Sequence, residues 1–231
     1  MAEATAAKII VLSAGAVQPG MTSVIEAFRR ERGYDFQLTF ATAPSINKRI
    51  GGGDSVDVVI APEAVLDELV SRGQASPHQR VTVGRIGVGV MVKEGGRLPK
   101  IATVEEFKDS LLSAESVVYN QASTGLYLDA LFEKLEIGEQ LKAKTTRYPD
   151  AAAVLNHIGK GKGDEIGLGA TTVIIEGQSR RLTFVGPLPE EIQNYTTYMA
   201  AAMTDSTPAL EFMRYLISPE ARRAFASAGI G

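Results

Sequence analysis

Residues 8–33 run KIIVLSAGAVQPGMTSVIEAFRRERG, which is an apolar stretch, a turn of small residues and an amphipathic stretch in that order. Lys8–Leu12 is typical of a buried strand, because its apolar residues are continuous rather than alternating. Met21–Arg32 repeats apolar residues at helical spacing, and Gly33 predicts the end of that helix. The opening of the chain therefore predicts a strand followed directly by a helix.

The same strand–helix pattern occurs twice more. We expect strands at Phe36–Phe40 and Val56–Ile60, and helices at Ala43–Ile50 and Glu63–Ser71. Regular alternation of strand and helix predicts a parallel sheet with right-handed crossovers. The carboxyl ends of such strands share one edge of the sheet, and ligands of open α/β sheets bind beyond that edge.

A second α/β lobe is expected beyond Val81–Val92, an apolar run long enough to cross from one lobe to the other. Residues 103–106 fit a capping box at the start of a helix. We predict a discontinuous lobe of residues 1–84 and 198–231, a continuous lobe of residues 85–197, and hinge-crossing segments near 83–92 and 195–203. The other expected elements are strands at Ser116–Tyr119, Glu165–Leu168 and Thr196–Met203, and helices at Ser123–Leu135, Tyr148–Gly159, Pro208–Ile217 and Pro219–Ala228.

Composition narrows the functional classes. The formal net charge is −3, from 24 Lys and Arg against 27 Asp and Glu, so we expect no nucleic-acid groove. The absence of Cys excludes disulfides, thiolate metal sites and cysteine nucleophiles. His78 and His157 do not have metal-ligand spacing, so we expect no metal and no cofactor. No apolar run approaches the ~20 residues of a membrane-spanning helix.

The first six residues, MAEATA, lack the charged and apolar regions of a secretion signal. We expect a mature N-terminus whose signal is not part of this sequence. A cytoplasmic protein with a similar start is the alternative.

Small hydroxyl and alanine residues recur where an expected strand gives way to a helix. Helix starts offer free backbone N–H groups and a favourable dipole, and small side chains let an oxyanion approach them. Ser and Thr also precede helices simply as caps, and that alternative stays open at each position taken singly. The candidates for binding an anion are Ser13, Ala14, Thr42, Ala43, Ser123, Thr124 and Gly125, with Ala151 and Gly169 at two further ends.

Enzyme signatures are weaker. The chain has no G-x-S-x-G motif, and the glycines at 51–53 are not followed by the Gly-Lys-Ser/Thr of a P-loop. Tyr119, Asn120 and Arg147 flank the expected edge, where they would orient a carboxylate or move a proton. Core packing or surface pairing is the alternative for each of the three.

The chain resembles the periplasmic molybdate-binding protein family of ABC transporters, which has the type II periplasmic-binding-protein fold. Lys8–Ala14 is similar to the family's first strand, and Phe40–Ile50 to its segment before the second helix. SVDVVIA at Ser55–Ala61 resembles the third strand. FMRYLISPEARRAFA at Phe212–Ala226 is similar to the family's helix, Ser-Pro-Glu-Ala, helix ending.

The resemblance implies a two-lobed α/β fold, with a mainly parallel sheet flanked by helices in each lobe and a ligand in the interlobe cleft. Ser13, Thr42 with Ala43, Ser123 or Thr124, Ala151 and the segment at Gly169 would hold that ligand. Two positions depart from the family: Ala43 stands where a serine is usual, and Gly169 where a tyrosine commonly closes over the oxyanion. These losses favour a larger ligand, such as an organic carboxylate, over molybdate.

The function that the resemblance implies is capture of a small anion by a periplasmic, monomeric solute-binding protein that delivers it to an ABC permease. A first alternative is an isomerase of a small unsaturated polycarboxylate, similar to aconitate isomerase, with Tyr119, Asn120 and Arg147 as catalytic candidates. A second alternative is a receptor module that reports ligand occupancy to another protein. The resemblance does not separate the three.

Overall fold

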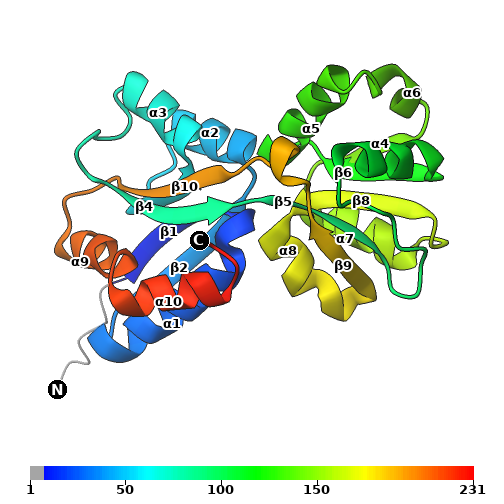
Figure 1. Cartoon of the computed structure of the whole chain (residues 1–231). Helices are drawn as coiled ribbons and strands as arrows, with labels where there is room; N and C mark the ends of the chain where they lie inside the picture. The colour runs from blue at the N-terminus through cyan, green and yellow to red at the C-terminus, as the bar shows by residue number, and fades with distance from the viewer. Residues whose placement is uncertain (1–7) are drawn as a thin grey trace. The chain divides into compact units, whose positions relative to one another are not determined.

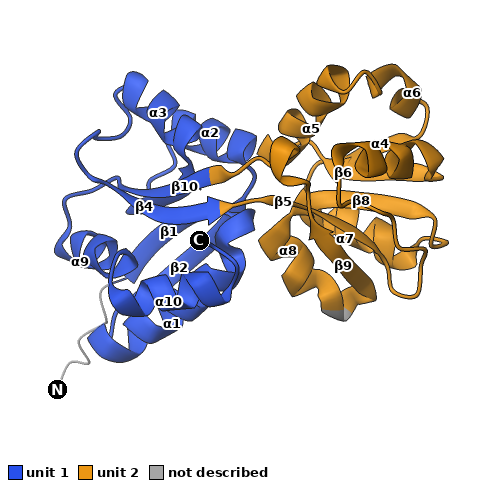
Figure 2. Ribbon diagram, viewed as in Figure 1, with its two compact units in different colours: residues 1–85, 197–231 blue, residues 86–196 orange. Residues whose placement is uncertain are grey.

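The computed structural model describes residues 8–231, so the expected mature N-terminus at residues 1–6 lies outside the described residues. The chain divides into two compact units (Figure 2). Unit 1 contains residues 1–85 and 197–231, and unit 2 contains residues 86–196. Each unit is built on one five-stranded sheet.

The sheet of unit 1 has the strand order β2-β1-β3-β10-β4. β1 lies parallel to both β2 and β3, whereas β10 is antiparallel to β3. The central strand β3 is fully buried, as its continuous apolar sequence predicts. The strands are β1 (Lys8–Ala14), β2 (Asp35–Ala41), β3 (Val58–Pro62), β4 (Arg80–Ile86) and β10 (Thr196–Ala202).

Helices cover both faces of this sheet (Figure 1). α2 (Ala43–Gly51) and α3 (Glu63–Ser71) lie on one face, and α1 (Gln18–Arg32), α9 (Thr207–Leu216) and α10 (Pro219–Ser227) lie on the other. A short 3-10 turn, η1 (Gly15–Val17), joins β1 to α1. Phe28 of α1 packs against Phe212 of α9, with ring centroids 5.3 Å apart, so the two helices share one aromatic core.

The sheet of unit 2 has the order β7-β6-β8-β5-β9. β6 is parallel to β7 and β8, and β5 is antiparallel to β8 and β9. The two sheets thus share one plan, in which three parallel strands adjoin an antiparallel one. The strands are β5 (Val88–Lys93), β6 (Ser116–Asn120), β7 (Thr145–Tyr148), β8 (Glu165–Ala170) and β9 (Leu182–Pro187).

Two hydrophobic clusters cover the two faces of this second sheet. One is centred on Phe107, Leu128 and Phe132, and the other on Val118, Val154 and Ile158. The first lies under α4 (Val104–Ser113), α5 (Ser123–Lys134) and α6 (Gly138–Lys142). The second lies under α7 (Ala151–Lys160), α8 (Thr171–Glu176) and η2 (Gly177–Arg180), and η3 (Glu190–Ile192) follows β9.

The predicted α/β class is confirmed, but several local predictions were wrong. Ser13 and Ala14 belong to β1 instead of following it. The run Val81–Val92, which was expected to pass from one lobe to the other, contains the boundary between the units after Arg85 and forms parts of two strands, β4 and β5, separated at Gly87. Tyr148 was expected in a helix but ends β7, because Pro149 disfavours helical geometry at the residue before it. β7, β9, α6 and α8 were not predicted, since short or polar segments carry little periodicity.

Candidate functional site

The carboxyl ends of three parallel strands meet at one edge of unit 1. Ala14 pairs with Ala41, and Ser13 pairs with Ile60, so β1, β2 and β3 end level with one another. Tyr198 pairs with Pro62, so the antiparallel β10 begins at the same edge. The turns that follow these strands lead into η1, α2 and α3.

Unit 2 has an equivalent edge. Asn120 at the end of β6 pairs with Tyr148 at the end of β7, and Ala170 at the end of β8 pairs with Val88 at the start of β5. The helices α5, α7 and α8 start just beyond these strand ends. The hydroxyl and alanine residues that the sequence predicted at strand ends thus lie on two edges, one in each unit.

Helices that start at these edges differ in capping from those that start elsewhere. α2, α5 and α8 begin after Thr42, Ala122 and Ala170, and none of these residues supplies a side-chain cap. None of the three helices has an acidic residue in its first turn. The first N–H groups of α2 and α5 are therefore not occupied by a capping side chain or neutralised by a carboxylate. In α8 the backbone N of Thr171 donates to the backbone O of Gly87 at 3.0 Å.

Side chains cap α4, α9 and α10, which start away from the two edges, whereas α6 has no side-chain cap but carries Glu139 in its first turn. Thr103 accepts a hydrogen bond from the backbone N of Glu106 in α4, at 3.2 Å. Ser206 and Ser218 cap α9 and α10 in the same way. α7 is the exception among the edge helices, because Asp150 accepts from the backbone N of Ala153 at 2.9 Å. The capping alternative thus holds for α7 but not for Thr42, which leaves its helix uncapped.

The candidates of unit 1 have different environments. Ser13 is fully buried, and its hydroxyl donates to the carbonyl of Ala14 at 3.3 Å. Ala14 precedes η1 and Ala43 begins α2, so their backbone N–H groups lie at helix starts. Thr42 is half-buried in extended geometry. Of the two predicted hydroxyls, that of Thr42 is better placed to meet a ligand.

Ser123, Thr124 and Gly125 form the first turn of α5, which follows β6 closely. The side chain of Asn120 accepts a hydrogen bond from the backbone N of Ala122 at 2.9 Å and shapes the turn between them. A Cβ atom on Gly125 would lie only 1.7 Å from the backbone oxygen of Asn120. Gly125 therefore acts by allowing close approach, and Ser123 and Thr124 carry the hydroxyls of this turn.

The last two ligand candidates lie on α7 and β8. Ala151 is the first residue of α7, directly after the Asp150 cap. Gly169 is one residue before the end of β8, where it pairs with Gly89 of β5. A Cβ atom on Gly169 would meet only Ile174, at 3.8 Å, so the strand tolerates a side chain at this position.

The three catalytic candidates do not form one cluster. The Tyr119 hydroxyl donates to Oδ1 of Asp129 at 2.7 Å, and Arg147 contacts Oδ2 of the same carboxylate at 3.0 Å. The Arg147 guanidinium also lies over the Tyr119 ring, 5.4 Å from its centroid. Asn120 instead bonds to the turn before α5. Sequence reasoning missed Asp129, which becomes significant only when α5 packs on β6.

Burial and the hydrogen bond to Asp129 raise the pKa of Tyr119 well above its ordinary value. The phenol is therefore protonated at neutral pH and acts as a hydrogen-bond donor, not as a base. Arg147 keeps one donor unused, because its buried Nε has no hydrogen-bond partner among the described residues.

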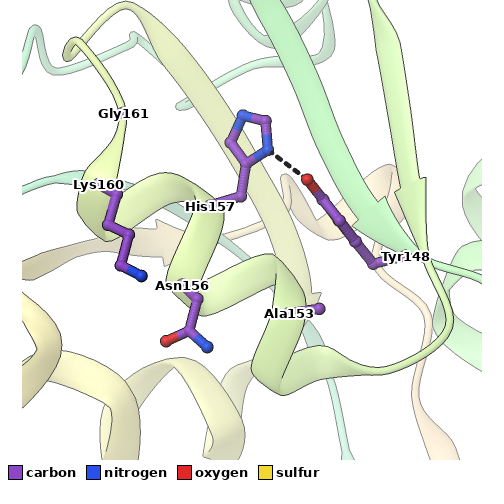
Figure 3. Close-up of a pocket in the computed structure, with 6 residues that line it drawn as sticks. All are labelled: Tyr148, Ala153, Asn156, His157, Lys160 and Gly161. Carbon is purple, nitrogen blue, oxygen red and sulfur yellow. Dashed lines mark hydrogen bonds between the residues drawn. The ribbon is translucent and has the colours of Figure 1, made fainter.

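A separate open pocket of about 500 Å³ lies along α7 (Figure 3). The Tyr148 hydroxyl is 2.8 Å from Nδ1 of His157 in its wall. None of the predicted ligand residues lines this pocket. Its lining residues are Tyr148, Ala153, Asn156, His157, Lys160 and Gly161.

No group of three His, Asp or Glu side chains in the described part of the chain is arranged to hold a metal ion. No helix among those residues is both long and apolar enough to cross a membrane.

Two α/β units of this topology, formed by a chain that passes from one to the other and back, define a class of two-unit binding proteins. The chain belongs to the family of bacterial extracellular solute-binding proteins, whose family model matches residues 9–231. The predicted relationship to type II solute-binding proteins is confirmed.

The proteins that this chain is similar to are named for different activities. The chain is 28% identical to an aconitate isomerase of a Pseudomonas species, over 96% of this chain and 87% of the relative. The periplasmic molybdate-binding protein of Azotobacter vinelandii has the same fold, with a TM-score of 0.78, 17% identity and coverage of 96% of this chain and 98% of that one. The sulfate-binding protein of Mycobacterium tuberculosis gives a TM-score of 0.75, 17% identity and coverage of 97% and 86%.

Proposed function

We propose that this solute-binding protein captures a small anion with the two strand edges described above. The observation that carries the proposal is the contrast in capping. α2 and α5 start at the carboxyl edges with neither a side-chain cap nor an acidic residue in the first turn, whereas side chains cap α4, α9 and α10. Free N–H groups and helix dipoles at a sheet edge favour a negatively charged ligand.

The proposed ligand is an organic carboxylate rather than molybdate. Ala43 offers no hydroxyl, and Gly169 offers no side chain. A buried tetrahedral oxyanion needs nearly all of its oxygens satisfied, and a lost bond to a charged group costs about 1.5–3 kcal/mol. The similarity to an aconitate isomerase supports a polycarboxylate ligand.

In this proposal the ligand is held by residues of both units. Thr42 and the N–H groups of Ala14 and Ala43 would come from unit 1, and Ser123, Thr124, Ala151 and the segment at Gly169 from unit 2. One lobe would contain residues 1–84 and 198–231, and the other residues 85–197. The segments near 83–92 and 195–203 would act as hinges between these lobes. We further propose that the protein works as a monomer in the periplasm and delivers its ligand to an ABC permease.

A second candidate function is isomerisation of an unsaturated polycarboxylate, and the aconitate isomerase relative favours it. Arg147, with its unused Nε donor, would hold a carboxylate, and Asn120 lies at the same strand end. Tyr119, whose pKa is raised, would stay a neutral phenol and act through hydrogen bonding rather than as the base. A receptor that signals occupancy is the third possibility and predicts the same binding.

A thermal-shift screen with molybdate, sulfate, citrate and the isomers of aconitate tests the proposal. A ligand at 100 times its Kd should add about 2.7 kcal/mol of stability. A shift with carboxylates supports the proposed ligand class, a shift only with tetrahedral oxyanions replaces it, and no shift with any anion refutes anion binding. Proton NMR of an unsaturated substrate incubated with the protein then separates binding from isomerisation.

A matched pair of variants locates the site. Ser123→Asp and Thr207→Asp each place a carboxylate at the first residue of a helix, α5 at the proposed site and α9 away from it. A negative charge at either helix start favours the folded state. Ser123→Asp should therefore fold yet lose the anion-induced shift, whereas Thr207→Asp should keep it. Equal shifts in the two variants would show that α5 is not part of the site.

A further inference from the structure

The side chain of Gln193 binds the main chain at the start of β5. Its Oε1 accepts a hydrogen bond from the backbone N of Val88 at 2.8 Å, and its Nε2 donates to the backbone O of Val88 at 3.0 Å. Oε1 also accepts from the backbone N of Asn194 at 2.9 Å. One carboxamide therefore binds both main-chain polar groups of Val88, whose carbonyl also accepts from the backbone N of Leu188 at 3.1 Å.

These bonds join the two segments through which the chain passes between the units. Val88 follows the passage from unit 1 into unit 2, and Gln193 precedes the return passage at Thr196 and Thr197. The return segment has a second attachment in unit 2, because the Tyr127 hydroxyl of α5 donates to the backbone O of Ile192 at 2.6 Å. Gln193 is thus fixed on one side by α5 and on the other by β5.

The first passage is also fixed on its unit 1 side. The backbone N of Arg85 donates to the backbone O of Gly231, and the backbone N of Gly231 donates to the backbone O of Arg85 at 3.1 Å. Two paired backbones, at Arg85 and Val88, therefore leave only Ile86 and Gly87 between them. The carbonyl of Gly87 accepts from the backbone N of Thr171 at 3.0 Å, so the freedom that remains is small.

We propose that Gln193 is a positioning residue that makes the two passages bend as one hinge. With the carboxamide in place, a rotation at Ile86 and Gly87 carries the segment after Ile192 with it. Without it, the start of β5 and the return segment would move independently, and the two units would sample a wider range of separations. This proposal rests on the proposed function in one respect only: the bending would serve closure on a ligand.

A ligand-free experiment tests this inference independently of anion binding. The natural chain has no Cys, so Glu26→Cys on α1 and Gln140→Cys on α6 introduce two unique sites for spin labels. Both positions are exposed, and they lie in different units. Electron–electron double resonance gives the width of the inter-unit distance distribution. Hydrogen exchange reports on the amide of Val88 in the same proteins.

Three substitutions separate the hydrogen bonds from side-chain volume. Gln193→Met keeps the length of the side chain but removes its hydrogen bonds to Val88. Gln193→Glu keeps the two acceptor bonds but loses the bond to the Val88 carbonyl, because a carboxylate does not donate. Gln178→Met on the exposed surface of η2 is the control.

We expect Gln193→Met to speed exchange of the Val88 amide about tenfold and to broaden the distance distribution, since the buried N–H of Val88 loses its partner. Gln193→Glu should give an intermediate width, and the control should match the parent. A faster Val88 amide with an unchanged width would overturn the hinge role. An unchanged Val88 amide in Gln193→Met would overturn the anchoring itself. If the Met variant does not fold, as judged by circular dichroism, the Glu variant decides by the same two measurements.

Discussion

Gly125→Ala is the substitution for which the structure predicts the largest local conflict at the proposed site. The added Cβ would lie 1.7 Å from the backbone oxygen of Asn120. Carbon–oxygen contacts in proteins normally begin at about 3.3 Å, so the first turn of α5 would have to move by roughly 1.5 Å. The obstacle is main chain in the sheet, and it has no rotamer with which to move aside. The displaced turn carries Ser123 and Thr124.

The cost follows from this geometry. Overpacking in a well-packed interior costs about 1–3 kcal/mol, and a rigid backbone neighbour places this case at the upper end. Ala would return up to about 1 kcal/mol through its higher helix propensity. We therefore expect a net loss of about 2 kcal/mol, which lowers Tm by roughly 4–8 °C in a chain of this size. Because the turn moves, anion binding should weaken as well.

Gly169→Ala is the matched control, because it also adds one methyl group to a buried glycine of unit 2. Its Cβ would meet only Ile174, at 3.8 Å. Replacing a strand glycine without strain is neutral or stabilising by about 0.5–1 kcal/mol. Thermal unfolding followed by circular dichroism compares the two variants. Melting of both within about 2 °C of each other would refute the close-approach argument, since that is less than the shift expected for 1 kcal/mol.

Substitutions at Thr42, Glu165 and Tyr119 test the capping and the two pKa shifts described above. Thr42→Ala should weaken anion binding with little change in Tm, whereas Ser218→Ala should cost about 1 kcal/mol of stability and leave binding intact. Calorimetry measures the binding, and thermal unfolding measures the stability. The reverse pattern would mean that Thr42 only supports its helix. For Glu165, burial raises the carboxyl pKa but hydrogen bonds from the N–H groups of residues 162 and 163 lower it more, so the net pKa lies below its ordinary value of 4.5. The stability that this carboxylate contributes is present above pH 4.5 and is lost as the pH falls through the lower folded-state pKa. Glu165→Gln should therefore lower Tm at pH 7. The difference in Tm between this variant and the parent should shrink below pH 4. If the protein isomerises a polycarboxylate, Tyr119→Phe should retain the proton-abstraction step, because the raised pKa keeps the phenol protonated. NMR measures this step as deuterium exchange at the substrate carbon. Loss of that exchange in the variant would show that Tyr119 is the base.

The sequence predicted those elements whose signal is local. Glu63–Ser71 forms a helix with exactly the expected bounds, because its apolar spacing and flanking residues agree. Thr103 and Asp150 cap helices as their positions indicate. The short strand β7, with the sequence TTRY, was missed because four mostly polar residues have no readable period, and it exists only through its pairing with β6.

The site could be predicted only in part, for a similar physical reason. Sequence position places Thr42 and Ser123 at helix starts, but it does not say whether their hydroxyls cap those helices or remain available to a ligand. That difference depends on where the turn leaves each side chain. Asp129 and Gln193 have no motif at all: the first acts through β6 and β7, and the second through Val88, which is 105 residues away in the chain. Such partners are fixed by sheet register and helix packing. Residues that position a site are therefore harder to recognise from sequence than the residues that contact its ligand, because their chemistry is satisfied inside the protein and leaves no local pattern.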